Sequence, residues 1–408
     1  MTDDQVLDIT ALGAQGDGSA IGDGARRYVP FALPGERVRS PGAGLPGILS
    51  APSPDRVPPT CRHFGVCGGC AAQHMSDALY ASWKRDNVVT AFAQRGLEPE
   101  VAPLVRVRPG SRRRAVFTAT VGRGGTVLGF HRHRSHDLVD VLECPVLVPA
   151  IVDKLPALRA ICAGLPQGEA RVTVLATRAG LDVAIDGVRT APSGTAMTRL
   201  VSLALESGIA RLTLAGAPLV ARTAPTLPIG GVETSVPPGI FVQAVEDAER
   251  ELVRRVADAT QGARRVADLF CGLGTFTYAL AERARVLAID SNASAVAALK
   301  SAAQHRQGLK PIETKVRDLF REPLSVLELQ GLDAVVFDPP RAGAAAQAKQ
   351  LAQSKVRTLV AVSCDAGTLA RDVRTLVDGG YVIESVTPID QFLYAPHVEI
   401  VAVLGKAR

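Results

Sequence analysis

The two halves of the chain differ in how hydrophobic and polar positions are arranged. Past residue 240, short runs of consecutive apolar residues alternate with helical segments. The apolar runs cover residues 264–270, 285–290, 333–337 and 358–362. Runs of this kind are typical of strands covered on both faces, and their alternation with helices indicates βαβ units around a parallel sheet. We therefore predict an α/β fold for residues 241–408.

The first half shows shorter and more interrupted patterns. Residues 1–50 alternate apolar and polar positions among many glycines, which predicts short strands and a small β-barrel. Residues 51–60 are rich in proline and read as a linker. A helix is expected from Ser76 to about Arg95, and residues 101–240 alternate short strands with Gly and Pro, as in an α+β domain. The predicted domains are 1–52, 53–240 and 241–408.

Length and composition support this division. A chain of 408 residues is too long for one hydrophobic core, and 47% hydrophobic with 21% charged residues is typical of a soluble globular protein. We found neither an apolar run long enough for a membrane helix nor the pattern of a signal peptide. The expectation is a cytoplasmic protein with no membrane contact and no obligate protein partner. Its seven cysteines should then serve chemistry or metal binding rather than disulfides.

Positive charge is concentrated in one window. Residues 105–136 hold eight arginines and no acidic residue, although the net charge of the whole chain is only +6. Such a window is the pattern of a surface that binds a polyanion, and arginine suits phosphate especially well. A solvated arginine-rich face is the alternative. We favour nucleic acid, and RNA in particular, as the partner.

Two predicted strands are each followed by a residue that could bind a ligand or take part in catalysis. Phe337 is followed by Asp338-Pro339-Pro340, and Val362-Ser363 is followed by Cys364. In an open α/β sheet, ligands bind beyond the carboxyl ends of the strands, so Asp338 and Cys364 should face one crevice. Cys364 is there a candidate nucleophile, although a buried structural thiol is the commonest fate of a free cysteine.

A glycine turn predicts a cofactor site. Asp268 to Phe276 reads as a strand entering a Gly-x-Gly turn and a helix, where free backbone N–H groups meet a ligand. Asp290 ends the next strand and could accept both ribose hydroxyls of an adenosine cofactor. Nicotinamide cofactors and S-adenosylmethionine both fit. Thr277 stands where a dinucleotide fingerprint has its third glycine, which favours S-adenosylmethionine.

Four further cysteines have the spacing of a metal site. Cys61, Cys67 and Cys70 lie within ten residues, and Cys144 follows later, just before a proline. Four thiolates suit either zinc or a [4Fe–4S] cluster. Zinc ribbons usually use two Cys-x2-Cys pairs, so this arrangement favours the iron–sulfur cluster. Cys162 and Cys271 have no partner at such a spacing and are expected to be core residues.

Together these segments resemble the uracil-C5 RNA methyltransferase family, in particular its iron–sulfur branch that acts on 23S ribosomal RNA. The match covers most of the chain. The motifs that carry it are Gly239 to Gln243, Asp268 to Phe276, Asp338 to Gly343, Ser363 to Asp365, and Asp390 to Phe392 with His397 to Glu399. The resemblance implies a class I Rossmann-like methyltransferase domain, an α+β central iron–sulfur domain and an N-terminal TRAM domain of the OB type.

The resemblance also implies the roles of particular residues. Cys364 would add to C6 of a flipped-out uridine, which makes C5 nucleophilic toward S-adenosylmethionine, and Glu399 would remove the C5 proton. The cofactor contacts carried over from the family are Gln243, Phe270, Thr275, Asp290, Asp318 and Asp338. The cluster ligands carried over are Cys61, Cys67, Cys70 and Cys144. This chain departs from the family pattern at Val245, where asparagine is usual.

Three other functions stay open at this point. The same reaction on the T-loop uridine of transfer RNA is one. A non-catalytic RNA-binding assembly factor is another, against which intact Cys364 and Glu399 argue. A nicotinamide-dependent oxidoreductase with an iron–sulfur cluster is the third.

Overall fold

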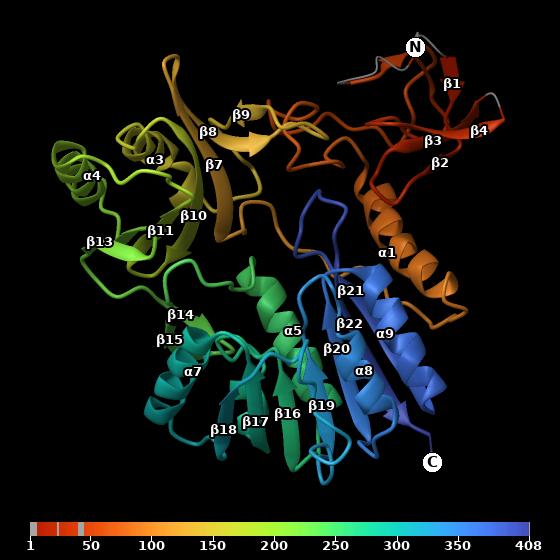
Figure 1. Cartoon of the computed structure of the whole chain (residues 1–408). Helices are drawn as coiled ribbons and strands as arrows, with labels where there is room; N and C mark the ends of the chain where they lie inside the picture. The colour runs from red at the N-terminus through yellow and green to blue at the C-terminus, as the bar shows by residue number, and fades with distance from the viewer. Residues whose placement is uncertain (1–5, 23, 40–44, 408) are drawn as a thin grey trace.

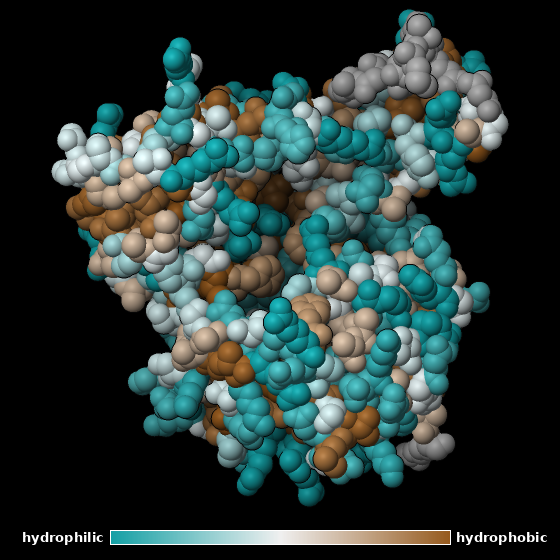
Figure 2. Space-filling model, in the orientation of Figure 1, coloured by the Kyte–Doolittle hydropathy of each residue, from teal (hydrophilic) through white to brown (hydrophobic). Residues whose placement is uncertain are grey.

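The structure, a computed structural model, describes residues 6–22, 24–39 and 45–407. Three parts are visible in Figure 1: small sheets near the N-terminus, a central part built on a large, mostly antiparallel sheet, and a C-terminal α/β part. Figure 2 shows that this face of the molecule is hollowed at its centre, where the three parts meet. No helix among the described residues is long and apolar enough to cross a membrane.

The C-terminal part contains a seven-stranded sheet in the order β18-β17-β16-β19-β20-β22-β21. All neighbouring strands pair in parallel except β22, which runs antiparallel to both β20 and β21. The four apolar runs predicted as strands are β16, β17, β19 and β20, so the predicted α/β fold is confirmed. The strands are β16 (Arg265–Leu269), β17 (Arg285–Asp290), β18 (Ile312–Val316), β19 (Ala334–Phe337), β20 (Thr358–Ser363), β21 (Tyr381–Ile389) and β22 (Glu399–Lys406).

Alternate residues of each strand supply the two cores on the faces of this sheet. In β16, Val266 faces one core, while Ala267 and Leu269 face the other. The first core is closed by α5 (Glu246–Ala259), α6 (Thr277–Ala281) and α7 (Ala293–His305). The second is closed by α8 (Ala345–Ala352), α9 (Ala366–Asp378) and α1 (Asp77–Ala93). Because both faces are covered, the inner strands β19 and β20 are almost entirely apolar and buried, as the sequence pattern requires.

The helix α1 is where the sequence predicts it. Ser76 accepts a hydrogen bond from the Leu79 amide and so caps its N-terminus. Trp83 and Val88 are buried, and Leu79 is half-buried. The helix packs against α9 and β21 of the C-terminal part, and it buries Lys84 as well.

The central part is a second seven-stranded sheet, in the order β13-β12-β11-β10-β7-β8-β9. Its strands are β7 (Arg114–Gly122), β8 (Gly125–His131), β9 (Leu138–Asp140), β10 (Gly168–Thr177), β11 (Gly180–Asp186), β12 (Arg211–Leu214) and β13 (Ala217–Ala221). Its helices are α2 (Pro149–Val152), α3 (Leu155–Cys162) and α4 (Gly194–Glu206), which share a core with the sheet. Cys162 is fully buried there, as expected.

A hairpin joins the central part to the C-terminal part. Its strands are β14 (Thr226–Ile229) and β15 (Val232–Ser235), and they pack in the same core as β16 and α7. Gly230 at its turn has positive φ, and a Cβ there would meet the Thr275 carbonyl at 2.5 Å. Only glycine allows this close approach. The domain limits at residues 52 and 240 stay a prediction.

The N-terminal part has two three-stranded antiparallel sheets, β1-β5-β6 and β2-β3-β4. The strands are β1 (Val6–Asp8), β2 (Ala11–Leu12), β3 (Gly18–Gly22), β4 (Ala25–Val29), β5 (Arg37–Arg39) and β6 (Gly47–Ile48). Leu7, Ile9 and Val38 belong to its small core. The short strands agree with the prediction, but the closed OB-type barrel is not confirmed. Residues 1–5, 23 and 40–44 of that prediction lie outside the described residues.

Candidate active site

Three strand ends bring the two predicted catalytic residues, Cys364 and Glu399, together with Asp338, which is predicted to contact the cofactor. Asp338 follows β19, Cys364 follows β20, and these two strands are parallel neighbours. Glu399 begins β22, which runs antiparallel to β20 so that Ile400 pairs with Ser363. The predicted meeting of Asp338 and Cys364 at one edge of the sheet is confirmed, and Glu399 joins them from the opposite strand direction.

A chain of hydrogen bonds connects the buried polar groups at this edge. The Gln243 amide donates to Asp338 Oδ2 at 3.1 Å, and Gln243 Oε1 accepts from Gln391 Nε2 at 2.7 Å. Gln391 Nε2 also donates to Glu399 Oε2 at 2.9 Å. Two neutral amides therefore lie between the two carboxyl groups.

Burial shifts the titration of all three reactive groups. Burial and, to a smaller extent, the nearby Asp338 charge raise the pKa of Glu399 to about 8, although the hydrogen bond from Gln391 acts in the opposite direction. Burial likewise raises the pKa of Asp338 to about 7. The pKa of the Cys364 thiol is raised to about 11 by burial and by the two carboxyls, with Arg341 acting in the opposite direction. The thiol must therefore give up its proton as it reacts.

The glycine turn after β16 forms the second half of the site. Phe270 and both glycines of the turn, Gly272 and Gly274, have positive φ. A Cβ at Gly274 would lie 2.9 Å from Tyr278 and 3.0 Å from Leu299, so the turn can close only with glycine there. The Gly272 amide donates to Asp290 Oδ2 at 2.9 Å, which fixes the carboxylate at the end of β17.

The remaining predicted cofactor residues surround this turn. The Phe270 ring lies 5.5 Å from the ring of Phe320, and Asp318 Oδ1 accepts the Phe320 amide at 2.9 Å. Thr275 is half-buried in the turn itself. Because β16 and β19 are where the strand order reverses, a ligand is expected at this position of the sheet. The structure thus groups Phe270, Thr275, Asp290 and Asp318 around one turn.

A buried lysine holds the loop before Glu399. The Lys84 ammonium lies 2.5 Å from Asp390 Oδ1 and donates to the carbonyls of Phe392 at 2.9 Å and His397 at 2.7 Å. Its side chain is completely buried. Tyr80, also on α1, donates to Asp390 through its hydroxyl. The helix α1 therefore fixes the path of the loop at both of its ends.

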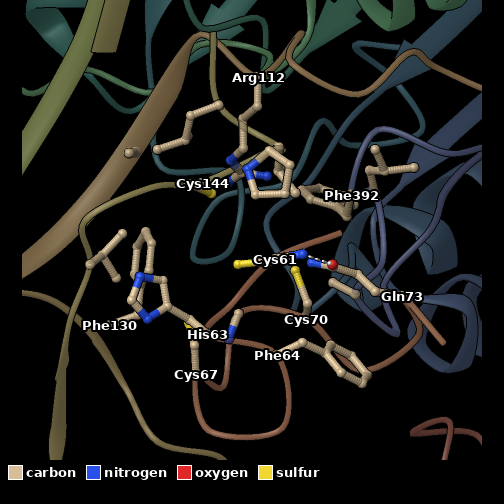
Figure 3. A pocket seen from close by; sticks show the side chains of 18 of the residues that line it. Cys61, His63, Phe64, Cys67, Cys70, Gln73, Arg112, Phe130, Cys144 and Phe392 are labelled. Carbon is tan, nitrogen blue, oxygen red and sulfur yellow. Dashed lines mark hydrogen bonds between the residues drawn. The ribbon is translucent and has the colours of Figure 1, made fainter. Parts of the chain in front are cut away.

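The four clustered cysteines line one cavity of about 280 Å³, shown in Figure 3. Figure 3 shows the four side chains directed around it, with Phe130 on one side and Phe392 on the other. Arg341 and His397 also line this cavity, so it reaches from the cysteines to the edge of the catalytic group. Among the described residues, no three His, Cys, Asp or Glu side chains are grouped so that they could hold a metal ion as they stand.

Burial raises the pKa of each of these four thiols, for Cys70 to about 12. The thiols also raise one another's pKa, since each thiolate repels the next. Backbone amides counter this, for instance those of Val146 and Leu147 at Cys144 and that of Gly69 at Cys67. Amides directed at sulfur are a common feature of iron–sulfur sites.

The arginine window turns out to be divided between two uses. Four of its arginines pair with acidic residues from distant parts of the sequence: Arg106 with Asp77, Arg108 with Asp247, Arg113 with Glu249, and Arg134 with Asp17. These pairs connect the parts of the molecule, so they add little to a free positive surface. Arg123 and Arg132 are exposed, and Arg112 reaches into the cysteine cavity.

Sequence reasoning missed the roles of two residues. Gln391 was part of a recognised motif, but nothing in its pattern showed that it contacts Glu399. Lys84 lies among polar positions of α1, and its burial follows only from the distant loop that it meets. Val245, which replaces the usual asparagine, is buried before α5 without a side-chain cap, and Glu246 and Asp247 in the first turn favour the helix instead.

Comparisons with known proteins agree with this geometry. Residues 232–407 match a family described as tRNA (Uracil-5-)-methyltransferase. A Brucella suis protein described as an RNA methyltransferase is 48% identical, with 98% of each chain covered. The 23S rRNA (uracil(1939)-C(5))-methyltransferase of Chromohalobacter salexigens is 35% identical, over 98% of this chain and 89% of its own.

A solved structure shares the overall fold. It is the tRNA (uracil-54, C5)-methyltransferase of Pyrococcus abyssi in complex with S-adenosyl-L-homocysteine, with a TM-score of 0.75. It is 23% identical, and the match covers 98% of this chain and 99% of that one. With the relatives above, the glycine turn and the strand-end cysteine, this leads to one assignment: the chain belongs to the family of S-adenosylmethionine-dependent RNA (uracil-C5-)methyltransferases.

Proposed function

We propose that this enzyme methylates C5 of a uridine in 23S ribosomal RNA through a covalent adduct with Cys364. The observation that carries the mechanism is the meeting of Cys364, Asp338 and Glu399 at one edge of the sheet. The relative at 35% identity that acts on 23S rRNA supports the choice of substrate. The four-cysteine set supports the same branch of the family.

In this proposal, each reactive residue has one task. The Cys364 thiol loses its proton to water as its sulfur bonds to C6 of the uracil, and the electrons of the C5–C6 double bond move toward O4, which makes C5 nucleophilic. Bound S-adenosylmethionine supplies the methyl group as an electrophile. Glu399 then accepts the C5 proton, and the electrons of the C5–H bond expel the Cys364 thiolate, so the double bond is restored.

The cofactor would lie along the glycine turn. Asp290, held by the Gly272 amide, would accept the ribose hydroxyls, and Phe270 and Phe320 would offer apolar surface for adenine. Asp318 would reach the adenine edge, and Thr275 would pack against the methionine end. Gln243 and Asp338 would contact the ligand from the side of the reactive groups.

The cysteine cavity fits a [4Fe–4S] cluster held by Cys61, Cys67, Cys70 and Cys144. A cluster supplies the positive charge that four mutually repelling thiolates need, and the backbone amides at the sulfurs suit it. The cavity of about 280 Å³ has more room than one zinc ion needs. Its task would be structural, since methyl transfer by this route moves no electrons.

Anaerobically purified protein tests the cluster directly. We expect iron and acid-labile sulfide in the wild-type protein and their loss in Cys144→Ser. Cys162→Ser is the matched control, because Cys162 is a buried cysteine outside the cavity, and it should keep both. Zinc without sulfide in the wild-type protein would contradict the cluster.

Methyl transfer to RNA tests the reaction and the substrate. Cys364→Ala should abolish 5-methyluridine formation while binding of S-adenosylmethionine persists in calorimetry. Mapping of 5-methyluridine in RNA from a deletion strain should show loss at one position of 23S rRNA. Loss confined to the T-loop of transfer RNA would instead establish the second substrate class, and full activity of Cys364→Ala would refute the adduct.

A further inference from the structure

The side chain of Gln391 is arranged to hold one oxygen of Glu399. Gln391 is 1% exposed, and both donors on its Nε2 are used, one on Gln243 Oε1 and one on Glu399 Oε2. It lies two residues past the end of β21, where Ile389 is the register partner of Glu399. Its position beside the carboxyl is therefore set by the sheet.

The direction of the amide chain is fixed from its other end. The Gln243 amide donates to Asp338, so the Gln243 oxygen is the atom left to face Gln391. Gln391 must then present its nitrogen, and a nitrogen that donates requires an acceptor at Glu399 Oε2. A proton that reaches Glu399 must consequently sit on the other oxygen, Oε1.

We propose that Gln391 is a positioning residue for the base: it anchors Glu399 through Oε2 and leaves Oε1 directed at the proton of C5. The inference rests on the proposed role of Glu399 and deepens it. Without the anchor, the carboxyl could turn about its last bond and offer either oxygen. With the anchor, the oxygen that accepts the proton is oriented before the uridine binds. This raises the rate, because the entropy of orienting the carboxyl is not lost in the transition state.

The anchor also favours the ionised form of Glu399. The groups around this carboxyl that titrate or carry charge are Asp338 and Cys364, with Arg341 and His397 beside them. Asp338 raises the pKa of Glu399, and the bond from Gln391 lowers it. Loss of that bond therefore raises the pKa, so that a higher pH is needed before Glu399 can act as a base.

The test is the pH dependence of the methyl-transfer rate in Gln391→Met, which keeps the length of the side chain and removes its donors. A hydrogen bond to a charged group is worth about one to two pKa units, so the acid limb of kcat should move up by about one to two pH units. At pH 7 the rate should fall about 10- to 100-fold, and raising the pH should recover much of it. Affinity for S-adenosylmethionine should fall far less than the rate at pH 7, since Gln243 keeps its bond to Asp338.

Gln347→Met is the matched control. Gln347 is a buried glutamine that bonds the Leu324 backbone away from the site, and its loss should lower stability without moving the acid limb. If Gln391→Met does not fold, Gln391→Asn replaces it, since its shorter amide cannot span both partners. A rate that falls equally at every pH, or an unmoved limb, would overturn the role of Gln391.

Glu399→Gln separates this outcome from failure of the proposed function. If Glu399→Gln keeps the full rate, Glu399 is not the base, and both ideas fall. If Glu399→Gln is inactive and Gln391→Met has the wild-type pH profile, the base stands and only the positioning role is refuted.

Discussion

The catalytic group and the cysteine cavity are two clusters of acidic groups that the fold stabilises differently. In the catalytic group, the amides of Gln243 and Gln391 lie between Asp338 and Glu399 and bond both carboxyls. In the cavity, the thiols face one another around open space, and Cys144 raises the pKa of the other three. One cluster is bridged by side chains of the chain itself. The other has backbone amides, the Gln73 side chain and the Arg112 guanidinium beside its thiols but no side chain that bridges them, which is why a cationic centre suits it.

The difference teaches what each cluster requires of the rest of the molecule. Neutral amides keep two carboxyls close while both remain able to exchange protons, as a base must. A metal centre would keep the thiolates permanently ionised, which suits a site that links segments of the chain rather than one that exchanges protons. A third device lies between them, where the Lys84 ammonium pairs with Asp390 on the loop that borders both clusters.

The largest effect is expected at that ion pair. Lys84→Met should lower the free energy of unfolding by about 3–5 kcal/mol, because Asp390 stays buried without its nearest cation and keeps only the more distant Arg106, at 3.8 Å. Urea denaturation measures the loss. In the double variant Lys84→Met with Asp390→Asn, part of the loss should return, since the unpaired charge is gone. A loss of stability below about 1 kcal/mol, the range of exposed ion pairs, would show that the Lys84–Asp390 pair does not hold the loop between the two clusters.

Glu399→Gln should have an intermediate effect and should stabilise the protein at alkaline pH. The folded-state pKa of Glu399, about 8, lies above the ordinary value of 4.5. Ionisation therefore costs stability, and the cost appears as the pH rises from 4.5 toward 8. Each pKa unit is worth about 1.4 kcal/mol, and allowing for the coupling to Asp338 we expect a gain of about 2 kcal/mol at pH 9.

The check is urea denaturation of wild-type protein and Glu399→Gln at pH 4 and pH 9. The two should be equally stable at pH 4, where the carboxyl is protonated in both the folded and the unfolded state. The same difference at both values would mean that the charge of Glu399 is not what costs stability.

The smallest effect is expected on RNA affinity, and it tests whether the catalytic group or the cysteine cavity faces the RNA. Phe241, two residues before Gln243, is 62% exposed, and the Arg114 guanidinium lies 5.6 Å from its ring centre. Phe130 lines the cysteine cavity and stacks on Phe117 at 4.9 Å. Phe241→Leu should weaken RNA binding by about 1 kcal/mol, because a stacking surface for a base is lost.

Phe130→Leu is the companion variant for that measurement. It should lower thermal stability and leave RNA affinity unchanged in a filter-binding assay at fixed salt. The reverse result would place the cysteine cavity, rather than the catalytic side, against the bases.

Much of the fold followed from local patterns in the sequence. Apolar runs predicted four strands of the C-terminal sheet, and parallel wiring alone placed Asp338 beside Cys364. Contacts across long stretches of sequence could not be predicted in this way. Arg113 looked like part of a surface for phosphate but is buried against Glu249, 136 positions away. Gln391 and Lys84 were missed for the same reason: their partners are chosen by packing, which leaves no periodic signal.

The pairing of Lys84 with Asp390 also bears on how the enzyme is made. The two residues are 306 positions apart, and the loop that Lys84 fixes immediately precedes Glu399. During synthesis α1 leaves the ribosome long before its partner exists, at about 5–20 residues per second. The lysine thus stays hydrated until Asp390 has emerged, and the base cannot be fixed in place earlier. A nascent methyltransferase of this design holds no complete active site until the segment from Asp390 to Glu399 has been translated.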